Sequence, residues 1–345
     1  MLPQFCVAPK IGLVRTDSTK THHLRDATLD TGGLGMERST PISVAVLGLV
    51  SGLLTTAPTA AEAAFTAIDF PDATATDALD INSAEAIVGR YVSATDGNTH
   101  GYLRDKQGEF TTVDFPGANF TVAAGIDSRG DIVGNYRLRG EPAMVRHGFL
   151  LSNGTFTSID PSGSVFANAL GISRRGDIVG RYCTVLPCVP VHQHGFLLSG
   201  GEFSTIDFPG AVGTSAWGIN DRGEIVGGYQ DRNAKSHVYL LREDQFTTID
   251  FPNAVDTAPF LLKGGINSSG DIVSYYCSLE PCLVGIMLML DNGSEHGFLL
   301  SDGEFSTINF PASRATLGFG INASGDIVGS YHDATGKEHG FLLSP

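Results

Sequence analysis

Residues 194–209 read HGFLLSGGEFSTIDFP, which is two apolar runs joined by a short glycine-containing turn. The second run is apolar at alternate positions and ends at a proline, which cannot continue a hydrogen-bonded ladder. The stretch therefore predicts a β-hairpin. HGFLL or a close variant occurs six times, and the last copy, at 339–345, reads HGFLLSP with no second strand after it.

Three phrases recur along the chain in a fixed order. F-x-x-I-D-F-P precedes G-I-N-x-x-G-D-I-V-G-x-Y, and after a loop comes H-G-F-L-L. The second phrase ends at Tyr91, Tyr136, Tyr182, Tyr229, Tyr276 and Tyr331. Four short strands in a unit of about 45 residues, repeated, are typical of a β-propeller blade. A linear solenoid is the competing interpretation, but its end repeats would be atypical, and here they resemble the middle ones.

We therefore predict an all-β fold, a six-bladed β-propeller of four-stranded antiparallel blades. From the axis outward the strands are a (G-I-N), b (D-I-V-G-x-Y), c (H-G-F-L-L) and d (F-x-x-I-D-F). The first F-x-x-I-D-F-P, Phe65–Pro71, has no H-G-F-L-L before it. This N-terminal strand is expected to pair with the last H-G-F-L-L and close the ring.

The segment before the repeats has the features of a leader. Residues 36–64 contain Arg38, an apolar core and an A-x-A site, which is typical of a secretory signal peptide. A transmembrane anchor is the alternative, although the apolar run is short for a bilayer. Residues 1–35 are interpreted as a disordered extension or a misassigned start. Residues 65–345 then form a single propeller.

Charge narrows the possible partners. The chain has 22 basic and 37 acidic residues, a net charge of −15. Such an acidic surface repels phosphate backbones, so nucleic-acid binding is not expected. The leader predicts a secreted protein, periplasmic or extracellular, without a membrane span after processing.

The combination G-I-N-x-x-G-x-I-V-G followed by H-[AG]-F resembles the bacterial HAF-type extracellular repeat family. The resemblance covers about 65–345 and rests on six matches in register; this chain has Gly where the family often has Ala. It implies export and a repeat fold. It implies no activity and carries over no catalytic residues.

Two of the loops between strands b and c contain paired cysteines, CTVLPC at 183–188 and CSLEPC at 277–282. In an exported chain they predict two local disulfides, Cys183–Cys188 and Cys277–Cys282. A four-cysteine zinc site is the alternative. The second loop continues into an apolar run at 283–290, which would fold over the channel as a plug, or act as a lid or a self-association patch.

Three residue types recur at one end of every blade: the His of strand c, the Tyr of strand b and the Asp or Asn of strand d. A six-fold ring of metal ligands is one interpretation. The other, which we favour, is a structural hydrogen-bond network within each blade. Its histidines are His100, His147, His194, His237, His296 and His339.

Positions that break the repeat are better candidates for a binding site. Asp80 replaces the Gly of G-I-N, Trp217 is the only tryptophan, and Lys263 stands where the other blades have small residues. All three belong to inner strands near the channel. The b–c loops vary most in length and share a face with the d–a loops, and function tends to lie on variable loops. We therefore expect the site at the channel mouth on the b–c/d–a face.

No familiar catalytic, phosphate-binding or calcium motif occurs, and neither a cofactor nor a metal is expected. We predict a binding or interaction module for an unknown extracellular ligand or protein. One alternative is an extracellular hydrolase or lyase acting on carbohydrate or a lactone, with Asp80 paired to an acid of the d–a loop, Asp72 or Asp77. Another is a structural matrix component.

Overall fold

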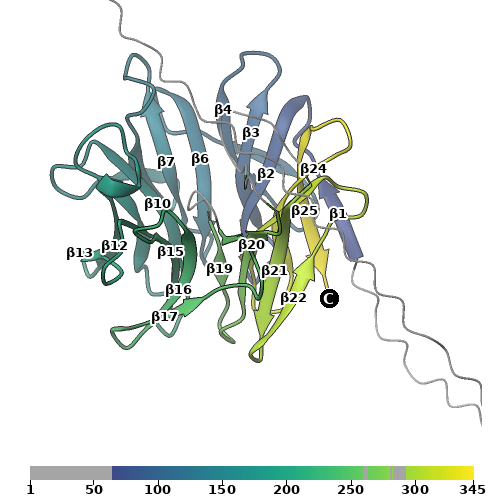
Figure 1. Cartoon of the computed structure of the whole chain (residues 1–345). Helices are drawn as coiled ribbons and strands as arrows, with labels where there is room; N and C mark the ends of the chain where they lie inside the picture. Colours follow the sequence, from purple (N-terminus) through teal and green to yellow (C-terminus); the bar gives the residue numbers. More distant parts are fainter. Residues whose placement is uncertain (1–63, 259–262, 280–281, 283–292) are drawn as a thin grey trace, which may run out of the picture. The chain divides into compact units, whose positions relative to one another are not determined.

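The computed structural model describes residues 64–258, 263–279, 282 and 293–345. Its strands stand upright around a common axis, with the β3–β4 loop at the top of the view and the β16–β17 and β21–β22 turns at the bottom (Figure 1). The only helix in these residues is one short 3₁₀ helix, Pro190–His192, and all their other secondary-structure elements are β-strands. The prediction of an all-β fold is confirmed.

The first three blades follow the a–b–c–d order that the repeat predicts. Their strands are β2 (Ala73–Ile81), β3 (Ile87–Ser93), β4 (Thr99–Arg104) and β5 (Phe110–Val113) in blade 1; β6 (Ala118–Ile126), β7 (Ile132–Leu138), β8 (His147–Ser152) and β9 (Thr155–Ile159) in blade 2; and β10 (Phe166–Ile172), β11 (Ile178–Cys183), β12 (Gln193–Ser199) and β13 (Glu202–Ile206) in blade 3.

The last three blades repeat the pattern, with two variations. Blade 5 has its inner strand in two pieces, and blade 6 takes its outer strand from the beginning of the repeat region. The strands are β14 (Gly213–Ile219), β15 (Ile225–Gln230), β16 (Ser236–Arg242) and β17 (Gln245–Ile249) in blade 4; β18 (Asp256–Thr257), β19 (Gly265–Ile266), β20 (Ile272–Cys277), β21 (Glu295–Ser301) and β22 (Glu304–Ile308) in blade 5; and β23 (Ala315–Ile321), β24 (Ile327–His332), β25 (Glu338–Ser344) and β1 (Ala64–Ile68) in blade 6.

Strand β1 closes the ring as predicted. It pairs antiparallel with β25, from Ala64 opposite Ser344 to Ile68 opposite Gly340. The hydrogen bonds define five sheets, because one parallel pair, Thr99 with Phe120, joins blades 1 and 2 into a single sheet. Counted by their four-strand units the blades number six, and β2 of blade 1 contacts β24 and β25 of blade 6.

Asparagines of the G-I-N phrase join neighbouring blades at the a–b turns. The Asn322 side-chain amide donates to the Asn82 carbonyl oxygen (3.3 Å), which links blade 6 to blade 1. Asn267 donates to Asn322 (3.2 Å) and Asn220 to Asn267 (3.0 Å) in the same way. Each Oδ1 also accepts backbone N–H groups of its own turn, as Asn82 does from Ala84 and Ala86. One side chain thus shapes the turn and fixes the neighbouring blade.

The apolar core lies mostly between blades. Val88 of blade 1 packs with Ala123, Ile132 and Phe149 of blade 2, and the same arrangement recurs around the ring. A further cluster follows the axis, where inner-strand side chains such as Leu170, Trp217 and Phe319 meet. Because each blade covers one face of the next, breaking the contacts between two blades weakens both.

Candidate functional site

The structure brings Asp80, Trp217 and Lys263 together at one cavity on the axis. The cavity measures about 30 Å³, and the glycine–isoleucine pairs at the ends of the inner strands also line it. It therefore lies near the a–b turns, and the expected placement of these three residues at the mouth on the b–c/d–a face is wrong. A space of this size holds about one water molecule and not a sugar.

Lys263 reaches across the axis. Its ammonium group donates to the carbonyl oxygens of Ala124 in blade 2 (2.5 Å) and Leu170 in blade 3 (2.9 Å), and the residue is 5% exposed. Asp80 accepts from the Ile126 N–H of blade 2 (3.2 Å). Burial raises the pKa of Asp80 and lowers that of Lys263, and the attraction between the two charges opposes both shifts. The pair connects four blades, so its contacts are those of a brace. A ligand-binding role for these residues stays a prediction.

Trp217 is fully buried in the axial cluster. Its indole N–H has no hydrogen-bond partner within the described ranges. With no exposed surface, this side chain offers nothing to a ligand approaching from solvent.

Asp77 and Glu338 form a second acidic cluster, where blade 1 meets blade 6. Arg90 makes an ion pair with Asp77 and also reaches Glu338 (3.4 Å). Burial raises the pKa of Asp77 to about 7 despite Arg90. Burial acts in the same sense on Glu338, but His332, Arg90 and Asp77 outweigh it and lower its pKa to about 2. Asp77 lies within β2 and not in a loop, no contact joins it to Asp80, and Asp72 occupies an exposed turn. The predicted pairing of Asp80 with either acid does not occur.

The six repeat histidines each contact the acid or amide of strand d through Nδ1. The partners are Asp114 for His100, Asp160 for His147, Asp207 for His194, Asp250 for His237, Asn309 for His296 and Asp69 for His339, at 2.7–3.0 Å. The pairs lie within single blades. No group of three or more potential ligands is close enough to hold a metal ion in the described part of the chain.

Charge at these pairs affects the protonation of several histidines. The hydrogen bond that His237 Nδ1 donates to the Asp250 carboxylate has the largest influence on the pKa of His237, and it raises that pKa. Burial lowers the pKa of His100 and His147, but their carboxylate partners outweigh it and the net shift is upward.

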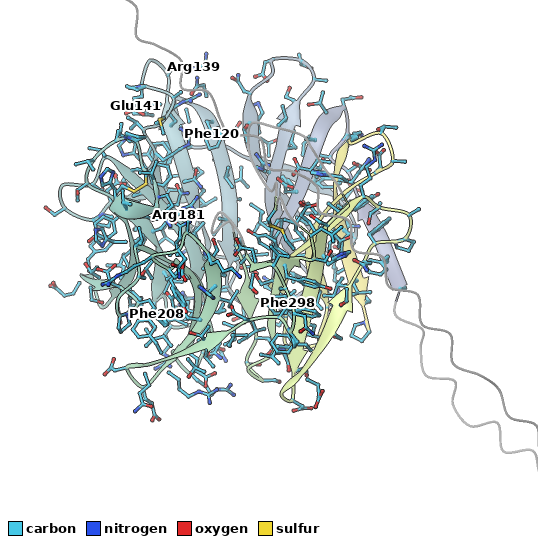
Figure 2. All side chains as sticks on the ribbon, viewed as in Figure 1. Phe120, Arg139, Glu141, Arg181, Phe208 and Phe298 are labelled. Carbon is cyan, nitrogen blue, oxygen red and sulfur yellow. A yellow bond between two sulfur atoms is a disulfide. The ribbon has the colours of Figure 1, made fainter. Side chains whose placement is uncertain are left out.

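The cysteine prediction is confirmed, because Cys183–Cys188 and Cys277–Cys282 both form disulfides (yellow in Figure 2). The alternative zinc site is thereby wrong. The apolar run 283–290 lies outside the described residues.

Exposed large apolar side chains concentrate on the b–c loops. The set comprises Met144 in blade 2, Val185, Leu186, Val189 and Val191 in blade 3, Leu279 in blade 5, and one strand residue, Phe203. Val191 is 60% exposed and Val185 45% exposed. Five of the seven therefore lie on loops of the adjacent blades 2 and 3, and Cys183–Cys188 braces the larger loop. We call these five residues the loop patch.

A groove lies on another side, between the outer strand of blade 1 and blade 2. It measures about 450 Å³ and is lined by Thr112, Asp131 and Phe156 among others. Its one arginine, Arg129, is held by Asp127 and Asp131 of its own turn (both 2.9 Å). With its cationic group already paired, this groove is a weaker candidate than the loop patch.

Blade 3 departs from the other blades at a position that sequence reasoning left unused. Each d–a loop connects one blade to the next, and five of the six carry a phenylalanine that stacks on the b-strand tyrosine of the blade that follows. Phe208, labelled in Figure 2, lies on Tyr229 with ring centroids 3.7 Å apart. Between blades 2 and 3 the equivalent residue is Pro161. The signal was visible, since F-T-S-I-D-P is the one copy in which proline directly follows the acid.

Comparison with solved structures shows the same fold. AofleA from Arthrobotrys oligospora is 14% identical, with 81% of this chain and 86% of that chain covered and a TM-score of 0.50. A fungal lectin from Aleuria aurantia, described as a six-bladed β-propeller with a novel mode of fucose recognition, is 12% identical, with coverage of 78% and 91% and a TM-score of 0.49. The propeller domain of the Trilobed protease from Pyrococcus furiosus is 10% identical, with coverage of 77% and 95% and a TM-score of 0.43. Of these three, only the likeness to AofleA reaches a TM-score of 0.50, and at 14% identity it shows the fold alone.

No protein-family model matches the chain, and no curated protein matches it either. Membership in the HAF-type family stays a prediction. Within the described residues, no helix has the length and apolar character needed to cross a membrane.

Proposed function

We propose that this chain is an exported binding module that recognises its ligand with the b–c/d–a face of blades 2 and 3. The observation that carries the proposal is the loop patch, since side chains such as Val185 and Val191 remain exposed on the same loop, which a disulfide braces. Exposed apolar groups gathered on one part of a surface mark interaction sites. The two disulfides fit an oxidising location outside the cytoplasm.

Carbohydrate is the ligand class with the most support. The fold is shared with a lectin described by its fucose recognition, and the proposed face combines apolar side chains with carboxylate and imidazole groups. Sugars bind where apolar faces and hydrogen-bonding groups lie together. The strongly acidic chain disfavours anionic polymers, so neutral glycans are the better candidates.

The enzyme alternative is less well supported. Asp77 and Glu338 have pKa values far apart, as an acid–base pair would need. Asp77, however, is 3% exposed and engaged by Arg90, so substrate cannot reach it. We assign this cluster to closing the ring between blades 6 and 1.

Binding of the full chain to a printed array of neutral glycans tests the proposal. Val185→Ser/Val191→Ser should weaken the strongest signals at least tenfold without changing the melting temperature, because both side chains are exposed. Lys106→Ser, in a c–d turn on the opposite face, is the matched control. Release of reducing ends from a bound glycan would establish the hydrolase alternative. Loss of binding with Lys106→Ser but not with the loop variant would refute the proposed face.

A further inference from the structure

Five of the six contacts between consecutive blades contain the same set of four aromatic rings. In each, a d–a loop phenylalanine lies flat on the b-strand tyrosine, with centroids 3.5–3.8 Å apart and planes within 3–5°. A third ring from strand c and a fourth from strand d complete the set. Between blades 3 and 4 these four are Phe208, Tyr229, Tyr239 and Phe246. We call the place of the phenylalanine the ring slot.

The contact between blades 2 and 3 lacks this phenylalanine, and a second substitution accompanies the loss. In the other five, the phenylalanine N–H donates to a threonine of the inner strand, as Phe208 does to Thr214 (2.9 Å). Here Pro161 has no N–H group, and Ala167 replaces the threonine. The donor and its acceptor are therefore absent together, which leaves no unsatisfied backbone group.

The rings that would enclose the phenylalanine remain in place. Tyr182 is partly exposed, whereas its five counterparts are 5–8% exposed. Phe203 is 40% exposed and still contacts Phe196 edge-on (centroids 5.5 Å apart). No aromatic ring stacks flat on Tyr182 in the part of the chain that the structure describes. One contact between blades thus has the buried Pro161 in place of the phenyl group, next to a partly exposed tyrosine.

Polar groups border the slot. The His194 side chain is 40% exposed, against 12–28% for four of its counterparts. Its Nδ1 contacts Asp207 (3.0 Å), but among the described residues its Nε2 has no polar partner. In the other five blades the Nε2 meets a carboxylate or, in blade 5, the Ser278 hydroxyl. The Tyr182 hydroxyl contacts the Thr205 hydroxyl (2.9 Å) at the same edge.

We propose that this slot between blades 2 and 3 binds the pyranose ring of a neutral sugar. The inference rests on the proposed function and names the site for it. At the other five contacts the equivalent position holds a flat six-membered ring lying on a tyrosine, and at this contact the smaller ring of Pro161 stands there instead. The apolar C–H face of a pyranose would lie on Tyr182, and its hydroxyls would reach His194 Nε2, which a phenyl group cannot use. An exposed aromatic face next to an unpaired imidazole nitrogen therefore favours a sugar over an aromatic side chain.

Refilling the slot tests the proposal directly. Pro161→Phe/Ala167→Thr restores the residues of the other five contacts and should weaken binding of the full chain to array glycans at least tenfold, while raising the melting temperature. Tyr182→Ala should give a similar loss without changing residue 161. Tyr182→Phe keeps the ring and should bind within about threefold of the original chain. His194→Asn should weaken binding several-fold.

The outcomes separate the site from the proposed function. If Val185→Ser/Val191→Ser abolishes glycan binding while both the refilled variant and Tyr182→Ala bind normally, the slot is wrong and the proposed face stands. If phenylalaninamide binds, and loses binding on refilling, while no glycan or methyl glycoside binds, the slot takes an aromatic side chain and the sugar proposal is wrong. If no array glycan binds at all, the sugar proposal is likewise overturned. Should the refilled variant fail to fold, Tyr182→Ala compared with Tyr182→Phe decides the matter alone.

Discussion

Two neighbouring contacts between blades in this ring are built from equivalent strands but differ in what their aromatic residues do. Between blades 3 and 4, Phe208 lies on Tyr229 and its N–H donates to the Thr214 hydroxyl. The aromatic rings there pack against one another and stabilise the contact between the blades. Between blades 2 and 3, Pro161 and Ala167 stand at the equivalent positions, and Tyr182 is partly exposed. In a repeat protein every copy must support its neighbours. One repeat unit can take part in ligand binding if it loses a residue that packs between blades and the loss leaves no buried polar group without a hydrogen bond.

The largest effect is expected when the residue at the phenylalanine position of each contact is replaced by alanine. Phe208→Ala should lower the free energy of unfolding by about 3 kcal/mol, because it removes a ring packed against three others. Pro161→Ala should cost less, about 1 kcal/mol, because it removes a smaller buried ring and no aromatic stacking. Urea denaturation of the full chain measures both. Equal costs would mean that the two contacts are energetically alike and would remove the basis of the comparison.

Opening the blade-3 disulfide should have the next largest effect. Cys183→Ser/Cys188→Ser removes a bridge spanning five positions, and a cross-link of this size stabilises by about 2 kcal/mol. The variant should melt at a lower temperature and bind array glycans more weakly, because the loop patch loses its brace. Cys277→Ser/Cys282→Ser is the matched control in blade 5, and it should lower stability while leaving glycan binding unchanged.

Refilling the slot in two steps measures how the two substitutions depend on each other. Pro161→Phe/Ala167→Thr should raise the free energy of unfolding by about 1 kcal/mol, the typical value of one aromatic pair. Pro161→Phe alone should gain less, because its new N–H finds no hydroxyl acceptor. A double-mutant cycle should give a coupling of at least about 0.5 kcal/mol. If the effects of Pro161→Phe and Ala167→Thr on the free energy of unfolding are additive, the hydrogen bond between the two positions contributes nothing to stability.

The smallest effect concerns the histidine pairs. Asp250 raises the pKa of His237 above its ordinary value of 6.5, so the folded state holds a proton more tightly than the unfolded one. This contribution is fully present below pH 6.5 and is lost as the pH rises through the folded-state pKa. His237→Gln should therefore lower the free energy of unfolding more at pH 5.5 than at pH 8.5, and the difference, measured by urea denaturation at both pH values, should be less than about 1 kcal/mol.

His296→Gln is the matched control for that measurement. Its partner Asn309 is uncharged, so the substitution removes a hydrogen bond and no ion pair. A His296→Gln variant with the same pH dependence as His237→Gln would contradict the electrostatic explanation.

Much of the fold could be predicted from the sequence, because alternation and turn residues repeat in register. The closing strand Phe65–Pro71 followed from one unpaired copy, and both disulfides followed from loop position. The candidate site was less accessible. Alternation tells which side chains leave a strand on the same side, but not which rings they meet in the next blade, so the stacks between blades were missed.

Two inner-strand residues show the same limit. Lys263 lies between the two pieces of the blade-5 inner strand, β18 and β19, and its ammonium group reaches across the axis to blades 2 and 3. Asp77 seemed to belong to a loop but lies within the nine-residue β2. Positions of this kind depend on where a strand begins and breaks, which is the least regular part of the repeat.

The pairing of β1 with β25 has a consequence for assembly. The partners Ala64 and Ser344 lie 280 positions apart, so the blade that finishes the ring needs strands made at opposite ends of the repeat region. Until they meet, β25 is an open edge with free backbone groups, the kind of surface that templates aggregation. A chain whose first strand has not yet docked would present that edge to other copies. Docking of the five residues of β1 therefore covers the open edge of β25 and removes this route to aggregation.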